Sequence, residues 1–249
     1  MKIEVNSISE IRPKLTKRLS MKTLIGIPTY DKKDYCWVEF VSSIKRLKTP
    51  VYMVDTSEEI DSLRYDAEEE GFYYKHIQEE KRMNRVIKAR NEIIDYAIKN
   101  NYDYILFVDS DVIVPKDTIE RLMDSIKENS IVSGFYIVTN KLGLPTPAAK
   151  FYVEDQVFKI HVRDFLPVLI DNEVHDVDAI GMGCCLMSKE IFTKYKFRCE
   201  RGEYGDVTKA EDICFCDDIS KDNIKILFDT SLVCAHKISD DSTWEGKDV

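Results

Sequence analysis

The sequence of 249 residues predicts an α/β fold built on a Rossmann-like, mainly parallel sheet with a small antiparallel portion. Over residues 22–140, short apolar runs alternate with segments of helical periodicity, which is typical of repeated β-α units. The unbroken apolar run at 104–108 has strand length, as expected for a strand buried on both faces at the centre of a parallel sheet. After residue 141 the pattern changes to short stretches typical of hairpins.

In the first half, each apolar run is followed by a turn signal and then by an amphipathic segment. Ser57 is a predicted helix cap and Gly71 a helix stop. Consecutive parallel strands joined by helices imply right-handed crossovers. The expected strands are 23–27, 51–54, 72–77, 104–108 and 130–138, and the expected helices are 35–47, 57–70, 83–99 and one opened by Pro115.

The second half is predicted to contain shorter elements. Ser188 is a predicted cap for a helix, and a helix is expected at 211–219. Residues 199–210 are polar and are expected to form an irregular, mobile loop. The expected strands are 150–153, 157–162, 177–180, 184–187, 224–229 and 231–235, the last of which ends on His236.

Composition narrows the class of protein. An apolar content of 44% is ample for a core, and a formal charge of −9 disfavours nucleic acid as the main partner. No apolar run reaches the roughly 18 residues of a membrane helix, and no signal-peptide core is visible, so we expect a cytoplasmic protein, with peripheral membrane association left open. The seven cysteines include no Cys-x-x-Cys pair, which favours free buried thiols over a zinc site.

Two carboxylates follow the central strand. If the chain is extended there, Asp109 and Asp111 point the same way at the carboxyl edge of the sheet, where α/β folds bind ligands. Two carboxylates about 5 Å apart repel by ~3 kcal/mol at an effective dielectric near 20, which predicts a neighbouring cation. Mg²⁺ or Mn²⁺ completed by a diphosphate fits this chemistry. Alternatively, the pair begins a surface loop and caps the next helix.

Other features each leave two interpretations open. Arg90 lies inside the apolar stripe of the helix at 83–99, so it either extends to solvent or neutralises a buried or bound anion. Gly181-Met182-Gly183 permits close approach of a ligand or marks a bulge. No Gly-x-Gly-x-x-Gly or Gly-x-x-x-x-Gly-Lys follows the first strand, which argues against a dinucleotide cofactor or a P-loop.

From residue 24 to His236, the order of these motifs resembles the GT-A glycosyltransferases, in particular the family 2-like group that uses nucleotide-diphosphate sugars. Ile25-Gly-Ile-Pro-Thr-Tyr30 is similar to the first strand and nucleotide loop of that group, and Val54-Asp-Thr-Ser57 to its second-strand turn. Ala89-Arg-Asn91 resembles the helix start beside the donor. Phe107-Val-Asp-Ser-Asp111 resembles the Asp-x-Asp metal motif, Glu211-Asp212 the acidic pair that supplies the base, and His236 the late metal ligand.

The resemblance implies a metal-dependent, inverting hexosyltransferase that moves one sugar from a UDP- or GDP-linked donor to a glycan, lipid-linked, protein or small-molecule acceptor. Residues 22–140 would form the nucleotide-sugar half and 141–240 the acceptor half, between an arm at 1–21 and a tail at 241–249. No Gln-x-x-Arg-Trp follows the acidic pair, which disfavours a processive synthase. The implied site comprises a base (Asp212, or Glu211), metal ligands (Asp109, Asp111, His236), donor contacts (Pro28, Thr29, Tyr30, Asp55, Arg90, Asp109, Ser110) and sugar or acceptor contacts (Gly181, Gly183, Trp244).

Each implied role has a structural alternative. Asp55 could cap its own turn, Glu211 and Asp212 could be first-turn acids favoured by the helix dipole, and His236 and Trp244 could serve packing alone. Two other functions stay open: a phosphatase of the haloacid-dehalogenase type, which also ends a strand on Asp-x-Asp, and a non-catalytic nucleotide-sugar-binding protein. Against the phosphatase, three strand-helix units precede the motif here and Ile113 replaces the expected threonine.

Overall fold

The computed structural model describes residues 21–31, 33–59, 63–139, 145–153, 156–158, 171–239 and 242–244. Side chains are described in these ranges except at 151–158, 239 and 242–244. The expected arm at 1–21, apart from Met21, lies outside the described residues. So do most of the expected tail at 241–249 and the end of the expected strand at 157–162.

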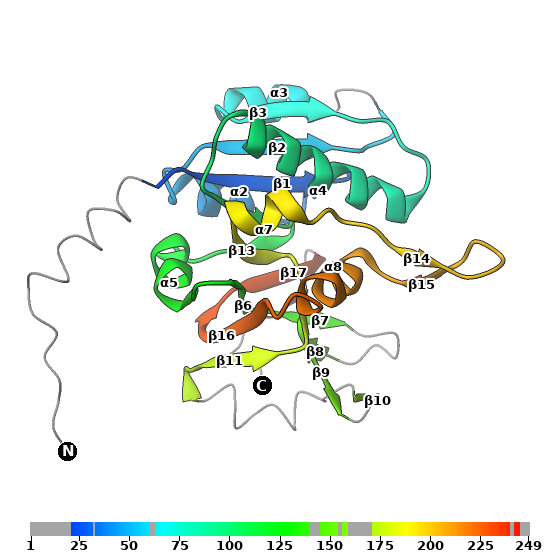
Figure 1. Ribbon diagram of the computed structural model, residues 1–249. Helices are drawn as coiled ribbons and strands as arrows, with labels where there is room; N and C mark the ends of the chain where they lie inside the picture. The colour runs from blue at the N-terminus through cyan, green and yellow to red at the C-terminus, as the bar shows by residue number, and fades with distance from the viewer. Residues whose placement is uncertain are drawn as a thin grey trace, which may run out of the picture.

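A twisted eight-stranded sheet forms the centre of the molecule, with strand order β11-β16-β6-β13-β4-β1-β2-β3 (Figure 1). Parallel pairing joins β1 to β2 and β4, β2 to β3, and β16 to β6, whereas β13 runs antiparallel to β4 and β6, and β11 antiparallel to β16. The predicted mainly parallel α/β fold is therefore confirmed. The strands are β1 (Thr23–Thr29), β2 (Val51–Asp55), β3 (Tyr73–His76), β4 (Tyr104–Val108), β6 (Ser130–Phe135), β11 (Val174–Val177), β13 (Cys184–Ser188) and β16 (Lys225–Val233).

Helices cover both faces of this sheet. One core cluster contains apolar side chains of α4, α7 and α8, and the cluster on the opposite face contains those of α2, α3 and α5. A side chain at Gly26 would overlap Ile93, so this glycine of β1 lets α4 pack directly on the strand. The helices are α2 (Trp37–Lys45), α3 (Arg64–Glu69), α4 (Arg82–Lys99), α5 (Thr118–Ser125), α7 (Lys189–Lys194) and α8 (Glu211–Ser220).

Small antiparallel elements gather beside the β6 and β16 side of the sheet (Figure 1). In three of them, β9 lies between β10 and β12, β7 pairs with β8, and β17 lies between β5 and β18. These elements confirm the predicted antiparallel portion. Their bounds are β5 (Val112–Ile113), β7 (Ile137–Thr139), β8 (Pro145–Pro147), β9 (Ala149–Val153), β10 (Gln156–Phe158), β12 (Ala179–Ile180), β17 (Ala235–Ser239) and β18 (Ser242–Trp244).

Two local predictions are wrong. Ser57 does not cap a helix, because its backbone N–H and its hydroxyl both donate to Asp55, and α3 begins only at Arg64. Residues 199–210 are not irregular: β14 (Glu200–Arg201) and β15 (Val207–Lys209) pair as a hairpin that projects from the body of the molecule (Figure 1). Gly205, at φ +80°, supplies the left-handed turn residue that this hairpin needs.

Two strand boundaries also differ from the prediction. The expected strand at 130–138 breaks at Tyr136 into β6 and β7, and the expected strands at 224–229 and 231–235 are instead β16 followed by β17, so His236 lies within a strand rather than after one.

The seven cysteines are all free thiols, six of them buried, as predicted. Burial in the core raises the pKa of the Cys216 thiol to about 12, so it stays protonated at neutral pH. Among the helices of the described residues, none has the length and apolar character to cross a bilayer.

Candidate active site

Two adjacent cavities open at the carboxyl edge of the central strands. The first, here called the strand-end cavity, has a volume of about 670 Å³ and lies beside the ends of β1 and β4 and the start of α4. The second, the hairpin cavity, has a volume of about 390 Å³ and lies between that edge and the small antiparallel elements. Arg90, Asp109 and Glu211 line both cavities and so form the wall between them.

Arg90 forms ion pairs with the other two residues of this wall. Its Nη1 lies 3.0 Å from Glu211 Oε1, and its Nη2 lies 3.0 Å from Asp109 Oδ1. The residue is only 3% exposed, so the interpretation in which it extends to solvent does not hold. Burial opposes the charged guanidinium, yet Asp109 and Glu211 outweigh burial and raise the pKa of Arg90.

Arg90 is not fully satisfied by these two partners. Its Nε is buried and has no hydrogen-bond partner among the described residues, although the Phe197 ring lies 5.4 Å from the guanidinium carbon. The pKa of Glu211 is raised, first by burial, and Arg90 acts in the opposite direction. The arginine therefore stabilises charge on two carboxylates that would otherwise be costly at this depth.

The second aspartate of the motif faces different partners. Asp111 Oδ1 lies 3.7 Å from His236 Nε2, and Oδ2 lies 3.7 Å from Lys33 Nζ. His236 Nδ1 is 2.8 Å from the carbonyl oxygen of Ile137, so Nδ1 carries the proton that is donated there. In the neutral ring, Nε2 then turns a lone pair towards a carboxylate oxygen, an arrangement that suits a cation between the two groups.

These positions revise the predicted three-ligand metal site. Among the described residues, no group of three His, Cys, Asp or Glu side chains is arranged to hold a metal ion. Asp109 is engaged by Arg90, which leaves Asp111 and His236 as the pair that fits a divalent cation. Mg²⁺ is usually bound through one or two carboxylates together with substrate phosphates, so a site with few protein ligands is compatible with this chemistry.

Tyr136 is a site residue that sequence reasoning missed. It is buried where β6 breaks into β7, and its hydroxyl oxygen accepts a 2.9 Å hydrogen bond from the N–H of Gly183. A side chain at Gly181 would overlap this hydroxyl, and one at Gly183 would lie 2.9 Å from it and 3.2 Å from Asp109 Oδ2. The two glycines, predicted to admit a ligand or a bulge, therefore admit Tyr136.

Asp55 lies away from both cavities. It is fully buried, its Oδ1 accepts the Ser57 N–H at 2.9 Å, and its Oδ2 accepts the Tyr74 hydroxyl at 2.8 Å. This geometry matches the alternative in which Asp55 holds its own turn, and Thr56 instead reaches the strand-end cavity. The backbone of Trp244 pairs with that of His236, while its side chain lies outside the described residues.

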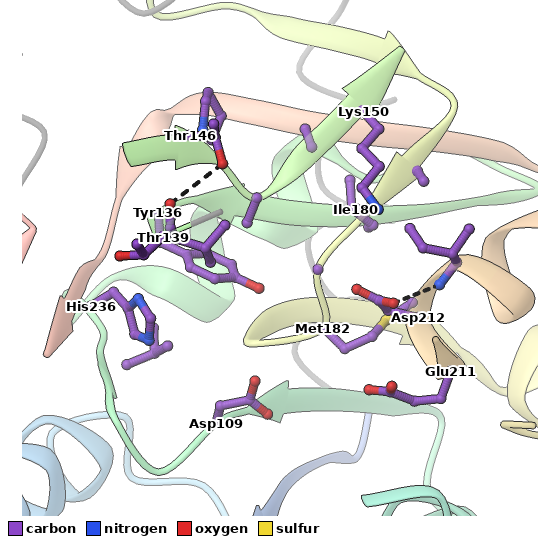
Figure 2. Close-up of a pocket in the computed structure, with 18 of the residues that line it drawn as sticks. Asp109, Tyr136, Thr139, Thr146, Lys150, Ile180, Met182, Glu211, Asp212 and His236 are labelled. Carbon is purple, nitrogen blue, oxygen red and sulfur yellow. Dashed lines mark hydrogen bonds between the residues drawn. The ribbon is translucent and has the colours of Figure 1, made fainter. Parts of the chain in front are cut away.

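The other predicted residues line the cavities. Pro28, Thr29, Tyr30, Ser110 and Asp111 line the strand-end cavity, together with Lys33, Arg82 and Arg85, three basic residues that the sequence analysis did not single out. Gly181, Asp212 and His236 line the hairpin cavity. Figure 2 shows the Asp212 carboxylate directed into that cavity, where it accepts the Ile213 N–H at 2.8 Å.

Comparison with known proteins identifies the family. The family model described as glycosyl transferase family 2 matches residues 25–195, well over half of the chain. The chain belongs to this family. It is a glycosyltransferase, and the matched segment includes both glycines and the Asp109 strand. No curated protein matches the sequence.

Solved structures share the fold at low sequence identity. The protein A197 from STIV is 17% identical, with a TM-score of 0.50 and 91% of each chain covered. S. aureus TarS 1–349 in complex with UDP is 17% identical, with a TM-score of 0.51, 90% of this chain covered and 60% of that one. Glucosyl-3-phosphoglycerate synthase from Mycobacterium tuberculosis, in complex with Mn²⁺ and UDP, is 14% identical, with a TM-score of 0.50 and 96% and 78% covered.

The family match does not favour the phosphatase alternative. The structure agrees, because Asp109 follows β4, an inner strand reached after three strand-helix units, rather than the first strand of the sheet.

Proposed function

We propose that this glycosyltransferase moves one sugar from a nucleotide-diphosphate donor to an acceptor hydroxyl, with a divalent metal and with inversion at the anomeric carbon. The observation that carries the proposal is the shared wall of Arg90, Asp109 and Glu211. On one side of it lies a cavity with basic residues, and on the other lies a cavity into which Asp212 projects. A donor and an acceptor held in the two cavities would meet at this wall.

The strand-end cavity suits a nucleoside diphosphate. Its rim includes Lys33, Arg82 and Arg85, which can offset phosphate charge in a protein of net charge −9. Tyr30 presents an aromatic ring 37% exposed, with the Arg85 guanidinium carbon 4.2 Å from the centre of the ring. UDP is the first nucleotide to test, because TarS and glucosyl-3-phosphoglycerate synthase both have structures with UDP.

Asp111 and His236 would hold the metal ion. A bound Mg²⁺ or Mn²⁺ supplies Lewis-acid stabilisation of the charge that develops on the departing diphosphate. The synthase structure with Mn²⁺ and UDP supports the choice of metal. The hydrogen bond from His236 Nδ1 to Ile137 holds the ring with Nε2 facing Asp111, which would orient His236 as a ligand before the donor binds.

Asp212 would act as the general base. The acceptor oxygen forms its bond to the anomeric carbon as the bond from that carbon to the phosphate oxygen breaks, and the hydroxyl proton passes to the Asp212 carboxylate. A base in the hairpin cavity and a leaving group in the strand-end cavity lie on opposite sides of the wall, which favours inversion. Glu211 is less suited to the role, because Arg90 engages it 3.0 Å away.

Titration calorimetry of UDP and of GDP, with and without Mn²⁺, tests this proposal. We expect one nucleotide to bind in a metal-dependent manner, Asp111→Ala to abolish the metal dependence, and Asp176→Ala to change nothing, because Asp176 lines neither cavity and forms an exposed pair with Lys225. Absence of binding by both nucleotides, together with Mg²⁺-dependent hydrolysis of p-nitrophenyl phosphate, would instead support the phosphatase. Binding without any sugar transfer would support the non-catalytic alternative.

A further inference from the structure

The hairpin cavity is lined by charged side chains of both signs. Asp109 and Glu211 lie towards one end of it, Lys150 enters from the opposite side, and Asp212 lies between them (Figure 2). Arg90 is the partner of Asp109 and Glu211 at the acidic end. Among the described residues, no carboxylate pairs with the lysine in this way.

Lys150 directs its side chain into the cavity from β9. Its register partner across the sheet, Ala179 of β12, also lines the cavity, as expected for paired residues that point to the same face. The ammonium group forms no hydrogen bond and no ion pair with any of the described residues. By contrast, Lys33, Lys209 and Lys237 each lie within 4 Å of a carboxylate. A half-buried ammonium group with no ion-pair partner among the described residues is available to form a charge-assisted hydrogen bond with an anionic ligand.

The rest of the cavity lining indicates what kind of ligand fits. Thr139 and Thr146 line the same cavity and offer hydroxyl groups, while Ala148 and Ile180 line it with apolar surface. A ligand with an anionic group at Lys150 and a hydroxyl at Asp212 would match both side chains, and the reversed orientation would place its charge against carboxylates.

We propose that Lys150 binds an anionic group, a phosphate or a carboxylate, of the acceptor, and that this contact directs the acceptor hydroxyl towards Asp212. The inference rests on the proposed function, because it treats the hairpin cavity as the acceptor site. It adds a substrate class: acceptors that carry a negatively charged group as well as the reacting hydroxyl. Neutral acceptors of the same size would lose this contact and bind more weakly.

The test uses a matched pair of probes, sn-glycerol 3-phosphate and glycerol, titrated into protein saturated with UDP and Mg²⁺. Saturation of the strand-end cavity prevents the phosphate from binding there. The ¹³C-methyl resonance of Met182, which lines the hairpin cavity and is 1% exposed, reports binding by NMR. Lys150→Met removes the charge, Lys150→Arg retains it, and Lys116→Met, on the exposed turn before α5, is the matched control.

We expect glycerol 3-phosphate to shift the Met182 resonance saturably and glycerol to leave it unchanged at equal concentration. Loss of one charged hydrogen bond predicts that Lys150→Met weakens phosphate binding by about tenfold to a hundredfold. Lys150→Arg and Lys116→Met should bind the probe as the wild-type protein does. An unchanged UDP affinity in all variants shows that the fold is intact.

Three results would overturn the inference: no shift of Met182 with glycerol 3-phosphate, equal affinity for glycerol, or equal affinity in Lys150→Met. Failure of the proposed function has a different signature, since neither UDP nor GDP would bind. In that case the titration without nucleotide still reports on Lys150, because Met182 senses the hairpin cavity alone.

Discussion

Replacement of Arg90 by methionine removes the cation that joins the two cavities while keeping most of the side-chain volume. Two carboxylates, each 3.0 Å from a guanidinium nitrogen, then lose their partner. At a charge separation near 4 Å and an effective dielectric of about 20, each pair contributes ~4 kcal/mol of attraction, which the cost of burying the guanidinium offsets in large part. Removal of one member of such a network leaves uncompensated buried charge, so we expect a loss of about 3–5 kcal/mol in the free energy of unfolding at neutral pH.

The pH dependence of this loss follows from Glu211. Its pKa is already raised by burial, and without Arg90 it rises further. A carboxyl whose pKa in the folded protein exceeds its unfolded value contributes stability below the unfolded value, and this contribution is lost as pH rises through the folded value. The difference between Arg90→Met and the wild-type protein should therefore be largest at neutral pH and shrink as the solution is acidified through the raised pKa of Glu211.

Urea unfolding followed by circular dichroism, repeated at several pH values, measures both effects. In the double variant Arg90→Met/Glu211→Gln the Glu211 charge is absent and only Asp109 lacks its partner, so part of the lost stability should return. A loss below about 1 kcal/mol at neutral pH, or a loss that does not change with pH, would refute the idea that Arg90 stabilises buried carboxylate charge.

Three other variants test separate parts of the site. Asp212→Asn should lower kcat by about 10²–10⁴-fold and leave UDP affinity unchanged, and unchanged kcat in steady-state assays would exclude Asp212 as the base. His236→Ala should weaken Mn²⁺-dependent UDP binding by about 10-fold or more without loss of stability, measured by calorimetry, and equal affinity would show that His236 is structural. Gly181→Ala should destabilise the protein by about 1–3 kcal/mol because the new methyl overlaps Tyr136, and Tyr136→Phe should restore much of this loss if the hydroxyl is the obstacle.

The sheet could be predicted from sequence because its signals are local. Apolar runs such as 104–108 have strand length, and α4 carries an apolar stripe that packs on β1. The predicted boundaries of helices were wrong where a single side-chain contact determines the local structure. Ser57 has the chemistry of a helix cap, but Asp55, two residues earlier, takes both its donors.

The site was predicted less completely, because its key contacts join residues far apart in the chain. The sequence placed Arg90 in an apolar stripe and left two interpretations open, and only the position of α8 against α4 brings Glu211 to it, 121 residues away. No sequence motif marked Tyr136 as a residue of the site. The nearest signal was the pair of glycines at 181 and 183, and nothing local indicates that the missing side chains make room for a tyrosine from the break between β6 and β7.

The most direct test of the account is a crystal structure with UDP and Mn²⁺, with the metal located by its anomalous scattering. The account predicts Mn²⁺ bound by Asp111 and His236, the nucleotide in the strand-end cavity, and Asp109 still paired with Arg90. A metal bound by Asp109 after release of Arg90, or a nucleotide bound outside that cavity, would contradict it.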